Sequence, residues 1–555
     1  MISYEGFTEE KTISNMLNQN LRISELQKSL EKYIDVIDLI QEDILGEQKI
    51  PLVNDKKRLG MIHHALNIEN YKKSEFRQRL LEHTEDEEII PFLKKLKIFS
   101  EEFKTNPKKR FSIIKKAASK KWGNNKETEI FVKHFGYDES LYPKEIPTKK
   151  DEVIIKNSKN PMNILWSYQS RIFYDAVDEA EISANRFVIS MPTGAGKTKT
   201  AMQIVANFLN QGEIKNEQRQ VLWIADKEEL CDQAVNAFEE IWPHIGKFPI
   251  KLYKFFGDSK SKKFEKNSII IATYGKLRGI SKQKIINPDL IICDEAHNAI
   301  ATTYKETIEN ISEYKTRVIG LTATPMRSDD IETEELVEFF YGHEPLSIDF
   351  EDEENAIEYL QKREFLSKYD AYTIDSEAKF SISRDLLKLI EKDRDLPKKF
   401  LQEIAENETR NLVISRLLHK LGEDKIKVLY FAPTKEQSKL MCALMISFGF
   451  NASHVDGDTP ADYRKGVISK FREGETKILC NFGIFTTGFD DPKIDAVVIG
   501  RPTTSLVLHT QMIGRGMRGP KMGGTESFDL YRINDELPGV VLADSYFKEI
   551  WEYGK

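Results

Sequence analysis

Two series of short apolar runs stand out along the chain, one in its middle and one near its C-terminal end. The first contains RFVISMP, VLWIAD, SIIIAT, LIICDE and RVIGLTA, and the second contains KVLYFAP, KILCNFG and AVVIGRP. Short runs that are each followed by a helix or loop signal are typical of strands buried on both faces of a parallel sheet. The pattern therefore predicts an α/β protein with two doubly wound domains, over residues 156–328 and 421–535.

The N-terminal part of the chain follows a helical period instead. Its apolar residues recur at steps of three and four, with charged residues between them: Ile23, Leu26, Leu30, Tyr33, Ile37 and Ile40. Such an apolar face predicts an amphipathic helix, and we expect residues 1–155 to form a mostly helical N-terminal domain. Residues 329–420 are expected to form an acidic segment and helices that bridge the two α/β domains. Residues 536–555 are expected to form a C-terminal helix.

Composition narrows the class of protein. The chain is 40% hydrophobic and 31% charged, and its mean hydropathy is −0.47. No apolar run approaches the ~20 residues of a membrane span, and the first residues lack the basic-then-apolar pattern of a secretory signal. The cysteines are widely spaced and form no CxxC pair, so they favour neither a zinc site nor an iron–sulfur cluster. We expect a cytoplasmic protein with no membrane partner.

A glycine-rich segment, MPTGAGKT, lies between a predicted strand and a predicted helix. In this setting the backbone N–H groups of a loop and the helix N-terminus face bound phosphates. The expected ATP-binding loop residues are Thr193, Gly194, Ala195 and Gly196. Lys197 would reach the β- and γ-phosphates, and the Thr198 hydroxyl would bind Mg²⁺. Met191 stands where the general pattern has its first glycine, and the alternative interpretation is a glycine-rich turn without a ligand.

Two carboxylates end the apolar run LIICDE. Asp294 and Glu295 stand at the C-terminal end of a predicted strand, where open α/β sheets bind ligands. Asp294 suits Mg²⁺, which it would share with Thr198, and Glu295 suits the general base that activates the attacking water. Alone, the tetrapeptide DEAH could be a capped helix start. Its place 97 positions after Lys197, in the same predicted sheet, favours a catalytic role.

Three segments in chain order resemble motifs I, II and III of the DEAH-type helicases and translocases of superfamily 2: Met191–Thr198, Asp294–His297 and Gly320–Arg327. The resemblance implies two tandem RecA-like domains with ATP bound between them. It also implies that Thr322 and Thr324 couple ATP hydrolysis to motion between the two lobes. Upstream, LWSYQSRIFYDA resembles the element in which a glutamine, here Gln169, reads the adenine edge, although Trp166 and Ser167 replace the usual Arg-Pro pair.

Two further segments resemble motifs V and VI: Phe482–Pro492 and Gln511–Gly519. The residues thereby implied at the nucleotide, or in a bridge to His297, are Gly488, Asp490 and Gln511. Arg515 and Arg518 lie about one helical turn apart, so both can point toward a γ-phosphate held by the other lobe. An arginine placed there typically accelerates hydrolysis by about 10³–10⁵. Met512 replaces the first motif VI arginine, a departure found in the restriction-motor-like and XPB-like branch of the family.

Four threonines are the nucleic-acid contacts that the resemblance implies: Thr273, Thr434, Thr486 and Thr487. Thr273 lies in IIIATYGKL, which matches a backbone-contacting block of the family, and Thr434 follows KVLYFAP in the motif IV region. Asp226 replaces a usual His or Arg in motif Ia. Contacts of this kind hold a backbone without reading sequence. The expected partner is therefore DNA, or with less support RNA, bound without sequence preference and with strong salt dependence.

Charge is concentrated in two segments, although the net charge is only −7. Residues 94–126 are strongly basic, and four aromatic residues are interleaved with the cations: Phe99, Phe103, Phe111 and Trp122. These aromatics could be stacking platforms that extend a nucleic-acid track, or core residues beneath a solvated lysine face. Residues 329–358 are acidic, so we expect them to face away from the track, to bind a protein partner, or to form a solvated surface. Residues 1–155 are a second possible partner-binding region.

We therefore expect an ATP-hydrolysing helicase or translocase that uses ATP and Mg²⁺. The alternative is an ATP-gated nucleic-acid sensor or assembly subunit of a prokaryotic defence or repair complex, without strand separation. A phospholipase-like HxK nuclease is excluded, because none of the ten histidines is followed two residues later by lysine. Asp43 with Glu47-Gln-Lys49 fits a metal-nuclease pattern only superficially, because it lies on a predicted helix and its spacing is short. Since little sequence follows motif VI, any nuclease is expected on another subunit.

Overall fold

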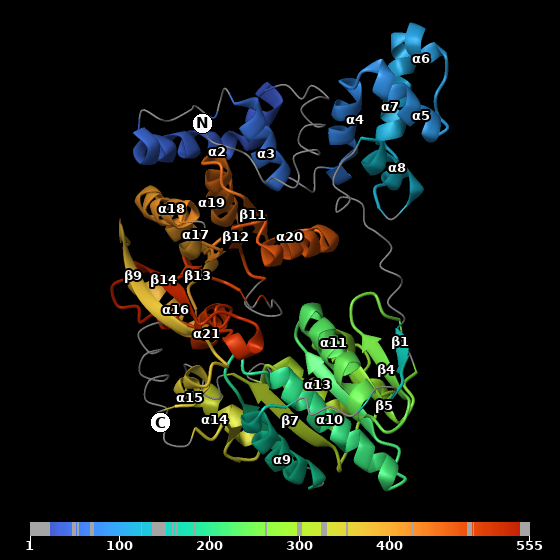
Figure 1. The fold of residues 1–555 in the computed structure, drawn as a ribbon, viewed down its shortest axis with the longest axis vertical. Helices are drawn as coiled ribbons and strands as arrows, with labels where there is room; N and C mark the ends of the chain where they lie inside the picture. Colours follow the sequence, from blue (N-terminus) through green and yellow to red (C-terminus); the bar gives the residue numbers. More distant parts are fainter. Residues whose placement is uncertain are drawn as a thin grey trace.

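The computed structural model forms two parallel-sheet lobes, with a group of N-terminal helices beyond the second lobe (Figure 1). The described residues are 23–46, 52, 55–66, 71–123, 125–135, 151–157, 160, 165–182, 185–260, 263–296, 302–323, 330–350, 353, 355–393, 395–424, 426–484, 491 and 493–543. The predicted α/β class, with two RecA-like domains and an N-terminal helical region, is confirmed. No helix in these ranges is long and apolar enough to cross a membrane.

The first lobe is an eight-stranded sheet in the order β1-β4-β5-β3-β6-β7-β2-β8. Its strands are β1 (Glu152–Ile155), β2 (Arg186–Ser190), β3 (Gln220–Ala225), β4 (Ile250–Phe255), β5 (Ser268–Thr273), β6 (Leu290–Asp294), β7 (Arg317–Thr322) and β8 (Leu346–Ser347). The described pairs are parallel apart from β1, which runs antiparallel to β4. Every residue of β3 and β6 is buried, as expected of strands covered on both faces.

Helices cover both faces of this sheet and form two separate apolar cores. The helices of the first lobe are α9 (Ser167–Glu181), α10 (Lys197–Ile214), α11 (Glu228–Ile245), α12 (Tyr274–Arg278), η5 (Ser281–Gln283) and α13 (Thr302–Ile311). The first core contains buried residues of α9, α10 and α11, and the second contains buried residues of α12 and α13. This arrangement leaves the carboxyl ends of the strands as the open edge, where the predicted motifs lie.

The second lobe is a six-stranded parallel sheet in the order β11-β12-β10-β13-β14-β9. Its strands are β9 (Lys368–Lys379), β10 (Val428–Phe431), β11 (Ala452–Val455), β12 (Ile478–Asn481), β13 (Ala496–Ile499) and β14 (Ser527–Glu536). Its helices are α16 (Arg384–Asp393), α17 (Lys398–Glu406), α18 (Glu408–Glu423), α19 (Lys435–Ser447), α20 (Ala461–Glu473), α21 (Leu506–Ile513) and η7 (Pro520–Met522).

The segment predicted as an acidic stretch and bridging helices differs from that prediction. It does contain helices α14 (Asp330–Phe339) and α15 (Ala356–Lys362), but β8 joins the first sheet and the long strand β9 joins the second. β9 is an edge strand with mostly exposed positions, so its sequence lacks the apolar run of a buried strand. Of the predicted C-terminal helix, residues 544–555 lie outside the described residues.

The acidic stretch is partly neutralised within the chain. Asp349 pairs with Arg171 of α9, and Lys362 pairs with both Glu353 and Glu358. These exposed pairs add little stability, but they account for part of the negative charge without a protein partner.

The first N-terminal helices dock on the second lobe. Helices α2 (Ile23–Leu45) and α3 (Lys56–Leu66) pack against α19 (Figure 1). Gln41 Nε2 donates hydrogen bonds to the carbonyl and hydroxyl of Ser447 at 3.1 and 2.8 Å, and Asp43 pairs with Arg416 at 2.7 Å. Within the predicted apolar stripe of this helix, Leu26, Leu30, Ile37 and Ile40 are buried. Their burial ties this part of the N-terminal region to lobe 2.

The remaining N-terminal helices that the structure describes form a small bundle, whose buried side chains are continuous with the first apolar core. They are α4 (Ser74–Glu82), α5 (Asp86–Lys95), α6 (Glu102–Thr105), α7 (Pro107–Ala118) and α8 (Lys126–His134). The buried Arg77 guanidinium donates to the carbonyls of Tyr71, Ala118 and Lys120, at 2.6 to 3.1 Å. These bonds join α4 to the end of α7 and satisfy a buried charge.

Three of the four aromatics in the basic stretch belong to this core. Phe103 is buried, Phe99 packs on it, and Trp122 packs on Phe131. For these three the core interpretation is confirmed. Phe111 differs, because it is 52% exposed.

Candidate functional site

The glycine-rich loop lies between β2 and α10, as its sequence predicts. Gly194 and Gly196 have φ angles of 89° and 81°, in the left-handed region that favours glycine. Gly196 caps α10, and Lys197 is the first residue of that helix. The backbone N–H of Met191 donates to the carbonyl of Thr322 at 3.0 Å, so the loop is fixed to the end of β7. Met191 is itself fully buried, which explains how an apolar residue replaces the usual first glycine.

Two side chains of α9 bind the backbone of this loop. Gln169 Nε2 and the Tyr168 hydroxyl both donate to the carbonyl of Ala195, each at 2.9 Å. The other end of the Gln169 amide accepts from the backbone N–H of Trp166 at 3.0 Å, and Gln169 is completely buried. Burial raises the pKa of Tyr168, so this hydroxyl remains a donor. Both ends of the Gln169 amide are thus bonded within the protein, and adenine recognition by this residue stays a prediction.

The two acidic residues of the DEAH segment lie at the end of β6. Burial raises the pKa of Asp294 to about 7; the neighbouring Glu295 adds to this rise, and Lys197 opposes it. Lys197 is therefore electrostatically coupled to Asp294, which brings the glycine-rich loop and the acidic pair into one site. A divalent cation fits this arrangement, because a buried carboxylate is stabilised by positive charge and Thr198 stands in the first turn of α10.

Glu295 has an unusual backbone. Its φ is 51°, in the left-handed region that a residue with a side chain rarely adopts. Residues held in such conformations are frequent at active sites, where the surrounding structure imposes them. The Glu295 N–H donates to Oδ1 of Asp294 at 3.1 Å, so the two acidic residues hold each other in place.

The segment carrying the two arginines touches the glycine-rich loop directly. A methyl group at Gly514 would lie 2.4 Å from Cγ2 of Thr193, and a methyl group at Gly194 would lie 2.6 Å from the Met517 carbonyl. Contacts this tight between the two lobes leave no room for side chains. Arg518 also acts electrostatically on the first lobe, because its positive charge opposes the rise in the pKa of Tyr168.

The local conformation of this segment differs from the sequence prediction. Helix α21 ends at Ile513, so Arg515 and Arg518 do not lie one helical turn apart on a helix. They lie in the turn and loop that follow, where Gly514 and Gly516 allow close packing on Thr193 and Phe528.

The short segment 365–367, which precedes β9, contacts both the arginine-bearing turn of lobe 2 and α9 of lobe 1. The Ser367 hydroxyl donates to the carbonyls of Arg518 and Thr525, and the Gly519 N–H donates to the carbonyl of Phe365 at 3.1 Å. The Phe365 ring packs on Tyr168, with ring centroids 4.9 Å apart. Sequence reasoning missed Tyr168, Phe365 and Ser367, because no motif contains the last two and Tyr168 stands beside the better-known glutamine.

Comparisons with known proteins agree with this geometry. Residues 163–327 match the model of the Type III restriction enzyme, res subunit, and residues 410–519 match the helicase conserved C-terminal domain. The chain belongs to helicase superfamily 2. The match over the first lobe places it in the restriction-motor-like branch of that superfamily.

Individual relatives of this superfamily 2 chain are distant. The Saccharomyces cerevisiae putative ATP-dependent helicase IRC3 is 30% identical over 64% of this chain and 49% of its own length. The EcoKI type I restriction endonuclease subunit of Escherichia coli is 24% identical over 62% of this chain and 32% of its own length. A solved fragment of a putative HsdR subunit from Vibrio vulnificus is 22% identical, covers 73% of this chain and 68% of its own, and has a TM-score of 0.48. The chain spans about half the length of the first of these relatives.

The other predicted superfamily 2 residues fall into two groups. Gln511 is buried in α21, and Thr322 is buried at the end of β7. Thr273 ends β5 and precedes α12. The predicted residues that lie outside the described residues are His297, Thr324, Thr486, Thr487, Gly488 and Asp490.

Asp226, the departure in motif Ia, has a partner within the first lobe. It accepts a hydrogen bond from the Tyr304 hydroxyl at 2.6 Å, and the Tyr304 ring stacks on Tyr274 with centroids 3.9 Å apart. Tyr274 directly follows Thr273, so the two candidate backbone-contacting segments of the first lobe are linked to each other.

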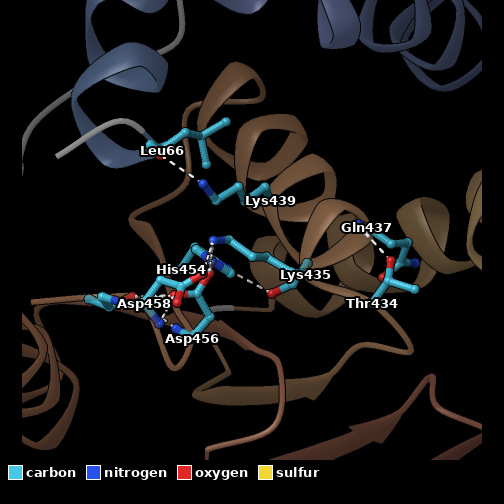
Figure 2. A network of polar contacts seen from close by, with 10 residues as sticks. Leu66, Thr434, Lys435, Gln437, Lys439, His454, Asp456 and Asp458 are labelled. Carbon is cyan, nitrogen blue, oxygen red and sulfur yellow. Dashed lines mark hydrogen bonds and ion pairs between the residues drawn. The ribbon is translucent and has the colours of Figure 1, made fainter. Parts of the chain in front are cut away.

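Thr434 lies beside a polar cluster at the carboxyl edge of the second sheet (Figure 2). Its hydroxyl accepts from the N–H of Gln437 at 3.2 Å and so caps α19. Next to it, Lys435 pairs with Asp456 at 3.2 Å and with Asp458 at 2.6 Å. The cluster borders a small cavity that Leu66 of α3 also lines.

His454 joins this cluster to Ser438. Its Nε2 lies 3.1 Å from Asp456, and its Nδ1 lies 2.8 Å from the Ser438 hydroxyl. The order Ser, His, Asp is that of a hydrolase, but Ser438 is completely buried and has no access to a substrate. Burial lowers the pKa of His454, and Asp456 opposes this shift. The cluster is therefore a buried structural network.

Proposed function

We propose that this chain hydrolyses ATP between its two lobes and uses the resulting lobe motion to translocate along, or unwind, DNA. The observation that carries the proposal is the direct contact between the glycine-rich loop of lobe 1 and the arginine-bearing turn of lobe 2 at Thr193 and Gly514. Because each half of the site comes from a different lobe, hydrolysis requires that the lobes close. Opening and closing then move the two nucleic-acid-binding edges relative to each other.

Each residue of the proposed site has a chemical role. Lys197 neutralises the β- and γ-phosphates, and Glu295 takes a proton from the attacking water. Arg515 and Arg518 stabilise the charge of the transition state from the second lobe. Mg²⁺ held by Thr198 and Asp294 would supply further neutralisation of phosphate charge. The residues proposed to relay or support these steps are Gln511 with His297, Thr322 with Thr324, and Gly488 with Asp490.

DNA is the proposed track, held by its backbone. The proposal of DNA draws on the relatives named as type I restriction subunits, and RNA is the competing choice because others are named as RNA helicases. Thr273 and Thr434 lie at the carboxyl ends of β5 and β10, where a strand could cross both lobes. Thr486 and Thr487 are proposed as further contacts.

A second candidate function is an ATP-gated sensor or assembly subunit of a defence or repair complex. The docking of α2 and α3 on α19 favours it, because it couples the N-terminal region to the position of lobe 2. Such a protein would clamp nucleic acid and signal to a partner without strand separation.

Turnover and movement assays separate these proposals. ATP hydrolysis is measured with single- and double-stranded DNA and RNA supplied separately, and strand and triplex displacement are measured on the same substrates. The motor proposal predicts ATPase stimulation by DNA together with displacement. Stimulation without displacement of either kind would refute the motor and favour the sensor. Lys197→Ala, in which nucleotide binding should be lost, is the negative control.

A further inference from the structure

One face of helix α7 is strongly basic. The helix spans twelve residues, contains five lysines and arginines, and has no acidic residue. Two of the cations are engaged in the bundle: Arg110 pairs with Asp86 at 2.5 Å, and Lys109 pairs with Glu102 at 3.5 Å. The other three lysines of α7 are exposed and have no ion-pair partner among the described residues: Lys108, Lys115 and Lys116.

An exposed aromatic ring lies between two of these lysines. Lys108, Phe111 and Lys115 follow each other at steps of three and four, so they lie along one side of the helix. With a rise of 1.5 Å per residue, the two lysines stand about 10 Å apart along the axis. This span corresponds to about three nucleotides of a duplex strand. Phe111 is 52% exposed, whereas Phe99, Phe103 and Trp122 pack in the bundle.

The stability of the helix accounts for Lys115 alone, because this lysine lies in the last turn, where a cation favours the helix dipole. Cations in the first turn of a helix oppose its dipole, yet Lys108 stands there with no acidic residue in the turn. The exposed ring of Phe111 does not add to the bundle core. Lys108 and Phe111 therefore carry a charge and an apolar surface that neither the helix nor the bundle core uses.

We propose that this face, defined by Lys108, Phe111 and Lys115, binds nucleic acid as a second contact outside the two lobes. The proposal rests on the proposed function and deepens it. The two lysines pair with backbone phosphates and read no sequence. The Phe111 ring stacks on an unpaired base, so single strands bind better than duplex at this face.

The bundle is suited to act as a tether. Arg77 and the packed aromatics fix α4, α7 and α8 relative to one another, so the face is presented by a rigid element. The chain N-terminal to the bundle is docked on lobe 2 through α2 and α3. A strand held by α7 therefore stays at high effective concentration near the two lobes after they release it.

Equilibrium binding of the full chain tests the proposal. The probes are a labelled mixed-sequence DNA single strand and the corresponding DNA duplex. The affinity for each is measured between about 50 and about 200 mM salt. The test variant is Lys108→Glu with Lys115→Glu. The matched control is Lys388→Glu with Lys399→Glu, which changes charge equally at exposed positions of α16 and α17. Thermal unfolding of each variant establishes that it is folded.

The proposal predicts a specific loss in the α7 variant. Removing two phosphate contacts lowers the salt slope for single strands by about 1.4, because each contact contributes about 0.7. The control keeps the wild-type slope, and Lys108→Gln with Lys115→Gln shows the same change without charge reversal. Phe111→Ala weakens single-strand binding at least about fivefold and duplex binding much less. At saturating DNA the ATPase turnover of every variant stays at the wild-type level.

The outcomes distinguish this inference from the proposed function. If the wild type binds DNA and the α7 variants bind with the same affinity and slope, the α7 proposal is wrong while the motor proposal stands. If the wild type binds neither probe, both proposals are wrong.

Discussion

The contact between Gly514 and Thr193 allows a test of lobe closure in which no catalytic side chain is substituted. Gly514 has an ordinary right-handed φ of −58°, so an alanine there adds no backbone strain. Its methyl group would lie 2.4 Å from Cγ2 of Thr193, about 1 Å closer than the start of normal contact at 3.4 Å. The arginine-bearing turn must therefore retreat from the glycine-rich loop by about that distance. A misplacement of about 1 Å can lower a catalysed rate about 10²-fold.

We expect Gly514→Ala to lower kcat for ATP about 10²-fold while the affinity for nucleotide changes little, because the glycine-rich loop belongs to the other lobe. ATP turnover at saturating DNA and binding of a fluorescent nucleotide measure the two effects. The control is Gly457→Ala in the same lobe, where an added methyl meets nothing within 4 Å. A kcat for Gly514→Ala within about twofold of the control would refute the reasoning, since the lobes would then not close through this contact during hydrolysis.

Three further predictions concern the site and its support. Glu295→Gln should bind ATP and hydrolyse it very slowly, as measured by nucleotide trapping, and wild-type turnover would overturn its assignment as the base. Ser367→Ala removes the donor to the Arg518 carbonyl, so kcat should fall while nucleotide affinity is retained; an equal fall in both would indicate a general loss of folding. Arg410 and Asp535 form a completely buried bidentate pair at 2.8 and 3.0 Å, so Arg410→Leu should destabilise lobe 2 by about 3–5 kcal/mol in urea unfolding, and an unchanged midpoint would contradict this.

Much of the fold could be predicted because its central strands are continuous apolar runs. Strands β3, β5 and β6 are buried at nearly every position, and their sequences show it directly. Strands at or next to an edge follow other rules: the edge strand β9 is largely exposed, and β4, which lies beside the edge strand β1, mixes lysines with apolar residues. Their place in the sheets is set by pairing with distant strands, which one sequence does not reveal.

The site was predicted in its residue types more than in its geometry. The glycine-rich loop and the acidic pair each occupy a short segment, so the sequence alone indicates both. The contacts that join the lobes, by contrast, are made by residues that lie far apart in the sequence. Ser367 and Arg518 are 151 positions apart, and no local pattern connects them. The prediction that both arginines lie one turn apart on a helix was wrong, because α21 ends at Ile513 and Gly514 and Gly516 follow in a turn.

The basic stretch, residues 94–126, also shows that a local sequence pattern does not reveal tertiary contacts. Periodicity alone left two interpretations for its aromatics, since a lysine-covered core helix and a nucleic-acid-binding helix have similar sequences. Burial separates them: Phe103 is 1% exposed and Phe111 is 52% exposed. The difference depends on which helix packs on which side, and that is a tertiary property.

The central claim is that an arginine of the second lobe acts on ATP bound by the first. The most direct measurement is ATP turnover by Arg518→Ala in the full chain at saturating DNA, alongside its affinity for nucleotide. We predict a fall in kcat of about 10³-fold or more with nucleotide affinity nearly unchanged. Wild-type turnover by this variant would contradict a site shared between the two lobes.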